Sequence, residues 1–134
     1  VTPDARLQET SATLFRNLYG QRVFRRSRVY SGVVMTLHTL RAAGLTLCCV
    51  TNKERKFAQP LLELAGISGF FAAVLCPERP EDRKPSPSLL YSACRLAEVE
   101  PIDMLLVGDS RADIEAGHAA GCRVVAVARA RGWR

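Results

Sequence analysis

The stretch Leu105-Leu106-Val107-Gly108-Asp109-Ser110-Arg111-Ala112-Asp113 joins an apolar run to a glycine and to two aspartates four residues apart. A continuous apolar run is typical of a strand that is covered on both faces of a parallel sheet. Gly108 permits a tight turn between this strand and a following helix. We therefore expect Asp109 at the carboxyl edge of a sheet, where open α/β folds bind ligands. Carboxylate oxygens at such an edge suit Mg²⁺.

A helix cap is the alternative interpretation of the same residues. Ser110-x-x-Asp113 matches a capping box, in which a serine and an acid satisfy the first amides of a helix and need no further function. This explanation covers Ser110 and Asp113 but not Asp109, so a cap alone and a cap beside a metal or phosphate site both remain open.

Two other segments carry polar residues at predicted strand or helix ends. Thr51 and Asn52 follow the apolar run 45–50 and precede a helix, whose amino terminus attracts phosphate. Thr51-x-x-Glu54 also matches a capping box. In Arg83-Lys84-Pro85-Ser86-Pro87, we expect Ser86 to be an N-cap and Pro87 to lie in the first helical turn. Lys84 then lies just before a helix, and an ordinary solvated lysine is the alternative.

Together, Thr51-Asn52, Lys84-Pro85 and Gly108-Asp109-Ser110-x-x-Asp113 resemble the motifs of the haloacid dehalogenase-like phosphatases, most closely the phosphoglycolate phosphatase branch. The resemblance covers about residues 30–128 and rests on the joint order and spacing of the motifs. It implies Mg²⁺-dependent hydrolysis of a small phosphomonoester through an aspartyl-phosphate, a covalent intermediate.

The resemblance also implies a role for each site residue. The Thr51 hydroxyl binds the transferring phosphoryl group, assisted by backbone donors near Asn52, and Lys84 neutralises developing negative charge. Asp109 holds Mg²⁺, and Asp113 either binds the ion through water or orients its ligands. These residue types suit phosphoryl transfer, which requires positioning and charge stabilisation above all.

One part of the family's pattern has no counterpart in these residues. The family's nucleophile and general acid/base lie in an Asp-x-Asp-Gly-Thr segment on its first strand, and no aspartate here belongs to such a pair. The sequence contains Asp4, Asp82, Asp103, Asp109 and Asp113. Two hypotheses follow: a phosphatase whose nucleophile is encoded upstream or supplied by another chain, and a non-catalytic, truncated remnant that binds phosphate and Mg²⁺ or assembles with a partner chain.

The alternation of helical and apolar segments predicts an α/β fold with a mostly parallel sheet and helices on both faces, a three-layer Rossmann-like arrangement. We expect strands near residues 45–50, 72–76, 103–107 and 123–127. In the resembling family, the first strand lies between those ending at Thr51 and Asp109. Without it, the remaining strands either pair across the gap or accept a strand from another chain, so a homo-oligomer or a strand-donating partner is expected.

Residues 1–28 have a different pattern, with Leu7, Leu14 and Leu18 at helical spacing. By the resemblance, they are a helical remnant of a cap domain, and residues 29–134 form a partial α/β core. At 134 residues and 48% apolar composition, the chain suffices for one hydrophobic core. No stretch resembles a membrane span or a secretory signal, so a cytoplasmic location is the expectation.

The net charge of +6 raises the question of nucleic-acid binding. The basic cluster Arg22, Arg25, Arg26 and Arg28 has few interleaved aromatic residues, which disfavours nucleic-acid binding. By the resemblance, a small phosphorylated metabolite is the expected partner. The five cysteines lack Cys-x-x-Cys spacing, which indicates core residues and not a zinc or redox site.

Overall fold

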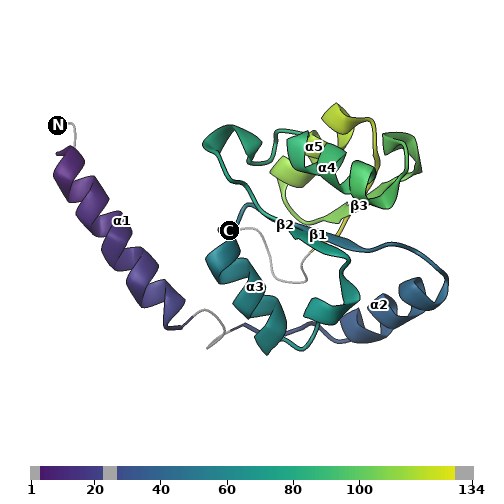
Figure 1. The fold of residues 1–134 in the computed structure, drawn as a ribbon, viewed down its shortest axis with the longest axis horizontal. Helices are drawn as coiled ribbons and strands as arrows, with labels where there is room; N and C mark the ends of the chain where they lie inside the picture. Colours follow the sequence, from purple (N-terminus) through teal and green to yellow (C-terminus); the bar gives the residue numbers. More distant parts are fainter. Residues whose placement is uncertain (1–3, 23–26, 129–134) are drawn as a thin grey trace.

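The computed structural model describes residues 4–22 and 27–128. Figure 1 shows the elements that follow in chain order. They are α1 (Ala5–Gly20), α2 (Val33–Ala42), β1 (Cys48–Val50), α3 (Arg55–Leu64), η1 (Ser68–Phe70), β2 (Ala73–Leu75), η2 (Pro80–Asp82), α4 (Ser88–Ala97), η3 (Pro101–Asp103), β3 (Leu105–Gly108), α5 (Arg111–Ala120) and β4 (Arg123–Ala126). The predicted α/β fold and the order of its elements are confirmed.

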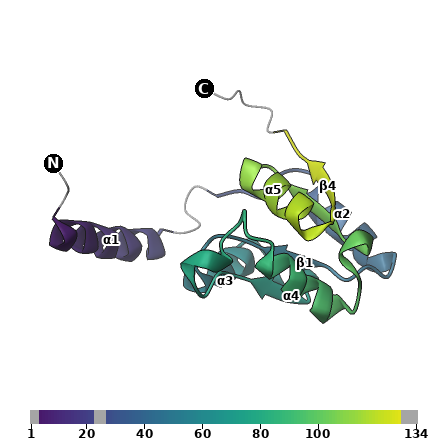
Figure 2. The ribbon, with the colours of Figure 1, turned by 90° about the horizontal axis from the view of Figure 1, so that it is seen from above.

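The four strands form two separate parallel sheets among the described residues. β1 pairs with β2, with Cys49 opposite Val74, and β3 pairs with β4, with Leu106 opposite Val124. Figure 2 shows the two halves, β4 with α5 in one and β1 with α3 and α4 in the other. The described residues therefore do not adopt the first alternative, in which the strands on the two sides of the gap pair directly with each other.

Helices cover the β1–β2 sheet on both faces, as predicted. Successive residues of a strand point to opposite faces. Cys49 and Val74 accordingly pack with Ala58 of α3, whereas Val50 packs against Leu90 of α4 in a second cluster. This half of the molecule has the expected three layers.

The β3–β4 sheet packs on α5 through Leu106, Ala116 and Cys122. On the opposite face of β3, Leu105 and Val107 are 53% and 59% exposed within the described chain. The apolar run of β3 predicted a strand covered on both faces. Within the described residues it is covered on one face, where α5 packs against the β3–β4 sheet.

Glycines follow the ends of three helices. Gly44, Gly66 and Gly121 come after α2, α3 and α5 and have positive φ angles, which favour glycine. The prediction for α4 is wrong by one residue, because the helix begins at Ser88 and Pro87 occupies the N-cap position. Ser86 accepts only a long 3.4 Å bond from the Ser88 amide, since the rigid ring of Pro87 lies between them.

The predicted amino-terminal helix is α1, which extends away from the body in Figure 1. Its apolar side chains Leu7, Leu14 and Phe15 are exposed, and Tyr19 near its carboxyl end makes an edge contact with Phe57 of α3. Of the basic cluster, Arg25 and Arg26 lie outside the described residues. No helix within residues 4–22 and 27–128 is both long and apolar enough to cross a membrane.

The cysteines are core or half-buried residues without disulfides. Burial raises the pKa of each of the five thiols above its ordinary value. Since the thiolate is the reactive form, these cysteines are poorly suited to nucleophilic chemistry.

Candidate functional site

Lys84 lies between β1 and α5 and bonds to both. Its ammonium donates to the Val50 carbonyl of β1 at 2.7 Å and pairs with Asp113 Oδ1 of α5 at 2.6 Å. The side chains of Lys84 and Asp113 are only 10% and 9% exposed. The alternative of an ordinary solvated lysine is therefore wrong, and Lys84 connects the carboxyl end of β1 to the helix that follows β3.

Asn52 fixes the backbone of Lys84 through both polar atoms of its amide. Asn52 Nδ2 donates to the Lys84 carbonyl at 2.9 Å, and Asn52 Oδ1 accepts from the Lys84 amide at 2.7 Å. Arg83 adds a bond to the Asn52 carbonyl at 3.2 Å. The Asn52 side chain thus positions Lys84. Binding of phosphate by backbone amides near Asn52 stays a prediction.

Thr51 ends β1 without capping the next helix. Its amide donates to the Leu75 carbonyl at 3.0 Å, and its hydroxyl accepts from the Lys53 amide at 3.1 Å. Because α3 begins at Arg55 with Glu54 as N-cap, the capping-box alternative for Thr51 is wrong. A hydroxyl that accepts one bond retains its own hydrogen as a donor, which suits the predicted role in phosphate binding.

The capping box of α5 is confirmed. Ser110 Oγ accepts from the Asp113 amide at 3.2 Å, and Asp113 Oδ2 accepts from the Ser110 amide at 3.0 Å. Ser110 Oγ also donates to Asp113 Oδ2 at 2.6 Å. Asp113 therefore uses one oxygen for the cap and the other for Lys84, so the helix cap and the site share this buried carboxylate.

The ionised Asp113 carboxylate should make the stability of the fold depend on pH in the acid range. Burial raises the pKa of Asp113, but the bonds from Lys84 and Ser110 outweigh burial and hold this pKa below its ordinary value. A depressed pKa contributes stability above the unfolded-state pKa, and this contribution is lost as pH falls through the folded-state pKa. We expect the free energy of unfolding to fall more steeply between about pH 5 and pH 2 in the wild type than in Asp113→Asn.

Denaturant titrations at several pH values measure this slope. Asp103→Asn is the matched control, because Asp103 lies in the exposed turn η3. Equal slopes for the wild type and Asp113→Asn would show that the Asp113 pair does not govern the acid response.

Asp109 lies where the sequence placed it, directly after β3 at the carboxyl edge of the sheet. It is exposed, and its amide donates to Asp113 Oδ2 at 3.3 Å. A Cβ on Gly108 would lie 2.4 Å from the Cβ of Asp113, so only glycine permits this approach of strand and helix. The glycine thus lets the turn that carries Asp109 approach Asp113, the carboxylate that pairs with Lys84.

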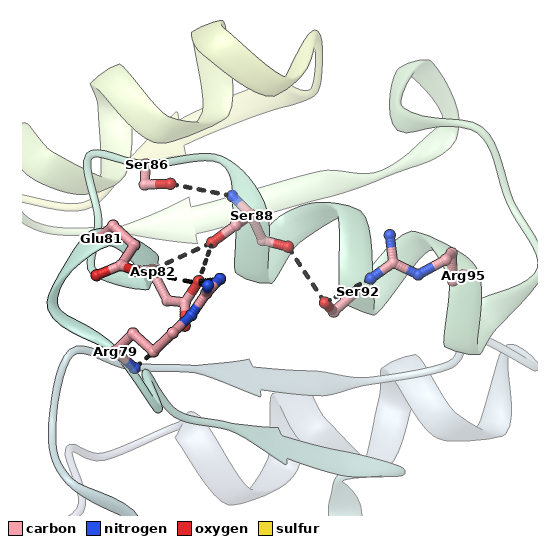
Figure 3. A network of polar contacts seen from close by, with 7 residues as sticks. All are labelled: Arg79, Glu81, Asp82, Ser86, Ser88, Ser92 and Arg95. Atoms are coloured by element: carbon pink, nitrogen blue, oxygen red, sulfur yellow. Dashed lines mark hydrogen bonds and ion pairs between the residues drawn. The ribbon is translucent and has the colours of Figure 1, made fainter.

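A polar network joins the segment before α4, which carries Lys84, to the start of that helix. Figure 3 shows its members, among them Arg79, Asp82 and Ser88. Arg79 Nη2 pairs with Asp82 Oδ1 at 3.2 Å, and the Ser88 hydroxyl bonds to the carbonyl and carboxylate of Asp82 at 3.4 Å. The bond from Arg79 lowers the pKa of Asp82. The sequence alone assigned Asp82 no role, although an arginine and an aspartate three residues apart are the available signal.

Comparison with known proteins agrees with this arrangement. The sequence profile described as Haloacid dehalogenase-like hydrolase matches residues 2–127. The chain belongs to this family.

Relatives of this haloacid dehalogenase-like chain include a phosphoglycolate phosphatase of Thiobacillus denitrificans, 38% identical over 125 residues. The match covers 93% of the chain and 55% of the relative. A crystal structure of a predicted phosphoglycolate phosphatase from Haemophilus somnus is similar with a TM-score of 0.79 at 40% identity, covering 84% of this chain and 50% of that one. The chain thus spans about half the length of these relatives.

The donor chemistry of this haloacid dehalogenase-like site fits Mg²⁺ in part. The exposed Asp109 carboxylate is a hard oxygen donor, and Mg²⁺ commonly uses one or two carboxylates and keeps several waters. Both oxygens of Asp113 are already bonded, one to Lys84 and one to the helix cap. Asp113 is therefore better suited to orienting the turn that carries Asp109 than to binding Mg²⁺ directly. Within the described residues, no three histidine, cysteine, aspartate or glutamate side chains gather in one place.

The remaining aspartates have other roles or positions in the described structure. Asp4 caps α1 and accepts from the Arg6 amide at 3.1 Å. Asp82 pairs with Arg79, and Asp103 lies in η3, before β3 begins. None of these three carboxylates is at the edge that carries Asp109.

Proposed function

We propose that this chain forms the phosphoryl-binding and Mg²⁺-binding part of a phosphatase site that hydrolyses a small phosphomonoester. The observation that carries the proposal is the position of Lys84, whose buried ammonium joins the strand that ends at Thr51 to the turn that carries Asp109. This link supports a site in which a cation, a hydroxyl and a metal-binding carboxylate act together, as phosphoryl transfer requires. The name of the relatives makes 2-phosphoglycolate the first substrate to test.

Each residue has a distinct task in this proposal. Thr51 donates its hydroxyl hydrogen to a phosphoryl oxygen, and the Lys84 ammonium, which Asn52 and Asp113 hold in place, stabilises negative charge in the transition state. Mg²⁺ bound at Asp109 supplies further charge neutralisation.

The attacking carboxylate comes, in this proposal, from a strand that is not among these residues. β1 and β3 each have one edge without a strand partner among the described residues, and such edges are templates for strand addition. A strand from another segment or from a partner chain would bring an aspartate to the same edge. Its carboxylate oxygen attacks phosphorus, the ester oxygen leaves and takes a proton, and water then hydrolyses the aspartyl-phosphate.

Phosphate binding tests the proposal without requiring turnover. We expect inorganic phosphate with MgCl₂, at about 100 times its Kd, to raise the free energy of unfolding by about 2.7 kcal/mol. Thr51→Val and Asp109→Asn should reduce this stabilisation, because they remove a phosphate donor and a metal ligand. Thr39→Val is the matched control, because the Thr39 hydroxyl bonds only within α2. Thermal and denaturant unfolding with and without phosphate provide the measurement.

The turnover assay tests the source of the nucleophile. We expect the chain by itself to show no Mg²⁺-dependent hydrolysis of 2-phosphoglycolate, because Asp4 caps α1, Asp82 pairs with Arg79 and Asp103 lies in η3, before β3. Robust turnover that Asp109→Asn abolishes would contradict the external nucleophile while supporting the site. Equal phosphate stabilisation in the wild type and Thr51→Val would contradict the phosphate site itself.

A further inference from the structure

An open cavity of about 390 Å³ lies between the start of α3 and the segment that joins β2 to α4. Its lining consists of residues 54–56, residues 77–80 and Arg83. Thr51, Lys84 and Asp109 are not part of this lining, so the cavity is distinct from the proposed phosphatase site. Its volume lies in the range of sites that bind small molecules.

Four of the residues that line the cavity are basic, and they differ in their partners. Lys56 and Arg79 are each paired with a neighbouring acid, at 3.0 Å and 3.2 Å. Arg55 and Arg83, in contrast, form no ion pair within residues 4–22 and 27–128. Two guanidinium groups at one cavity therefore have no protein carboxylate to neutralise them.

The two arginines reach the cavity from different elements. Arg55 is the first residue of α3, and Arg83 directly follows η2. The Arg83 guanidinium is positioned by a bond from its Nη2 to the Asn52 carbonyl at 3.2 Å. A guanidinium has five N–H donors in a planar fork, so donors remain on Arg83 after this bond. Such forks bind the paired oxygens of phosphate groups.

Glu78 is the one acid of the lining that opposes an anion. It is exposed and forms no ion pair among the described residues, whereas the carboxylate of Glu54 is already bonded to Arg16 and Lys56. Removing the charge of Glu78 should therefore strengthen the binding of an anion in the cavity, and removing that of Arg55 or Arg83 should weaken it.

We propose that this cavity binds a tetrahedral dianion, held by Arg55 and Arg83, at a second site apart from the phosphatase site. Sulfate, inorganic phosphate and the phosphate group of a small ester share this chemistry. The inference does not depend on the proposed function, because neither Mg²⁺ nor Thr51 takes part. Arg83 also bonds to Asn52, whose side chain fixes the Lys84 backbone, so the bound anion lies one residue contact away from the phosphatase site.

Sulfate is the probe for this site, because it is not a substrate for hydrolysis of a phosphomonoester. We expect a titration of the 134-residue chain with sodium sulfate, in EDTA and at constant ionic strength, to shift the amide NMR signals of residues 54–56 and 78–83. Arg55→Gln should raise the sulfate Kd read from these signals about fivefold, as expected for an exposed ion pair. Glu78→Gln should lower this Kd about twofold.

Arg95→Gln is the matched control, because it removes the same charge from α4, where the Arg95 guanidinium bonds to the Ser92 hydroxyl. We expect this variant to leave the sulfate Kd unchanged. Inorganic phosphate and glycerol 3-phosphate, titrated in the same way, distinguish the source of the ligand. Binding of all three anions supports a site for the phosphate group of a small molecule, and exclusion of the ester supports a site for inorganic ions.

Three results would overturn the inference. An equal loss of affinity in Arg95→Gln and Arg55→Gln would show general attraction by the net charge. Sulfate shifts confined to the amides near Thr51 and Asp109 would contradict a second site while supporting the phosphatase site. Absence of any sulfate-dependent shift would contradict the second site and leave the Mg²⁺-dependent phosphate site to its own test. If Arg83→Gln unfolds through loss of its bond to Asn52, Arg55→Gln decides, because Arg55 is exposed and unpaired within the described residues.

Discussion

Replacing Lys84 with methionine should lower the free energy of unfolding by about 3–5 kcal/mol, because it leaves a buried charge without its partner. Asp113 is 6% exposed and is held ionised by the Lys84 ammonium and by Ser110. The variant also removes the bond to the Val50 carbonyl, which ties Lys84 to β1. Loss of this much free energy is a large fraction of the stability of a small domain.

A double variant distinguishes charge burial from lost packing. Asp113→Asn can still accept the capping bonds, so Lys84→Met combined with Asp113→Asn should be more stable than Lys84→Met alone. Lys56→Met is the matched control, since the Lys56 side chain is 55% exposed. Denaturant unfolding at neutral pH provides the measurement. A cost of Lys84→Met no larger than that of the control would show that the pair with Asp113 contributes little.

Gly117→Ala should lower the free energy of unfolding by about 1–3 kcal/mol, even though alanine is the better helix former. A Cβ at this position would lie 2.4 Å from Val124 Cγ2 and 3.1 Å from Leu106 Cδ2. Valine is stiff at χ1, so it does not turn aside easily. Either α5 must move away from the β3–β4 sheet or both side chains must leave their preferred rotamers.

Relief of the overlap identifies its cause. Val124→Ala removes the nearest atom, so the double variant Gly117→Ala/Val124→Ala should lose less stability than the sum of the two single variants. Gly69→Ala is the control, because nothing lies within 4 Å of a Cβ there. Strict additivity in denaturant unfolding would contradict a steric origin.

Local chemistry made much of the fold predictable. The capping box of Ser110 and Asp113 and the apolar strand runs act between residues close in sequence, and both are confirmed. The exceptions are also local: Thr51 and Ser86 have the composition of N-caps, but their helices begin later, at Arg55 and Ser88. Pattern alone cannot choose among adjacent residues that satisfy a helix start nearly equally well.

The sequence by itself determined the order of strands and helices and the glycine turn that precedes Asp109, and it singled out Thr51, Lys84 and Asp113 as candidate site residues. Only the tertiary structure decided how these residues are used. The Lys84 ammonium pairs with Asp113, the Asn52 amide holds the Lys84 backbone, and Tyr19 holds Lys53 across 34 positions of sequence. Such contacts join segments that come together when the chain folds. Periodicity and capping rules describe neighbours along the chain, so they do not contain this information.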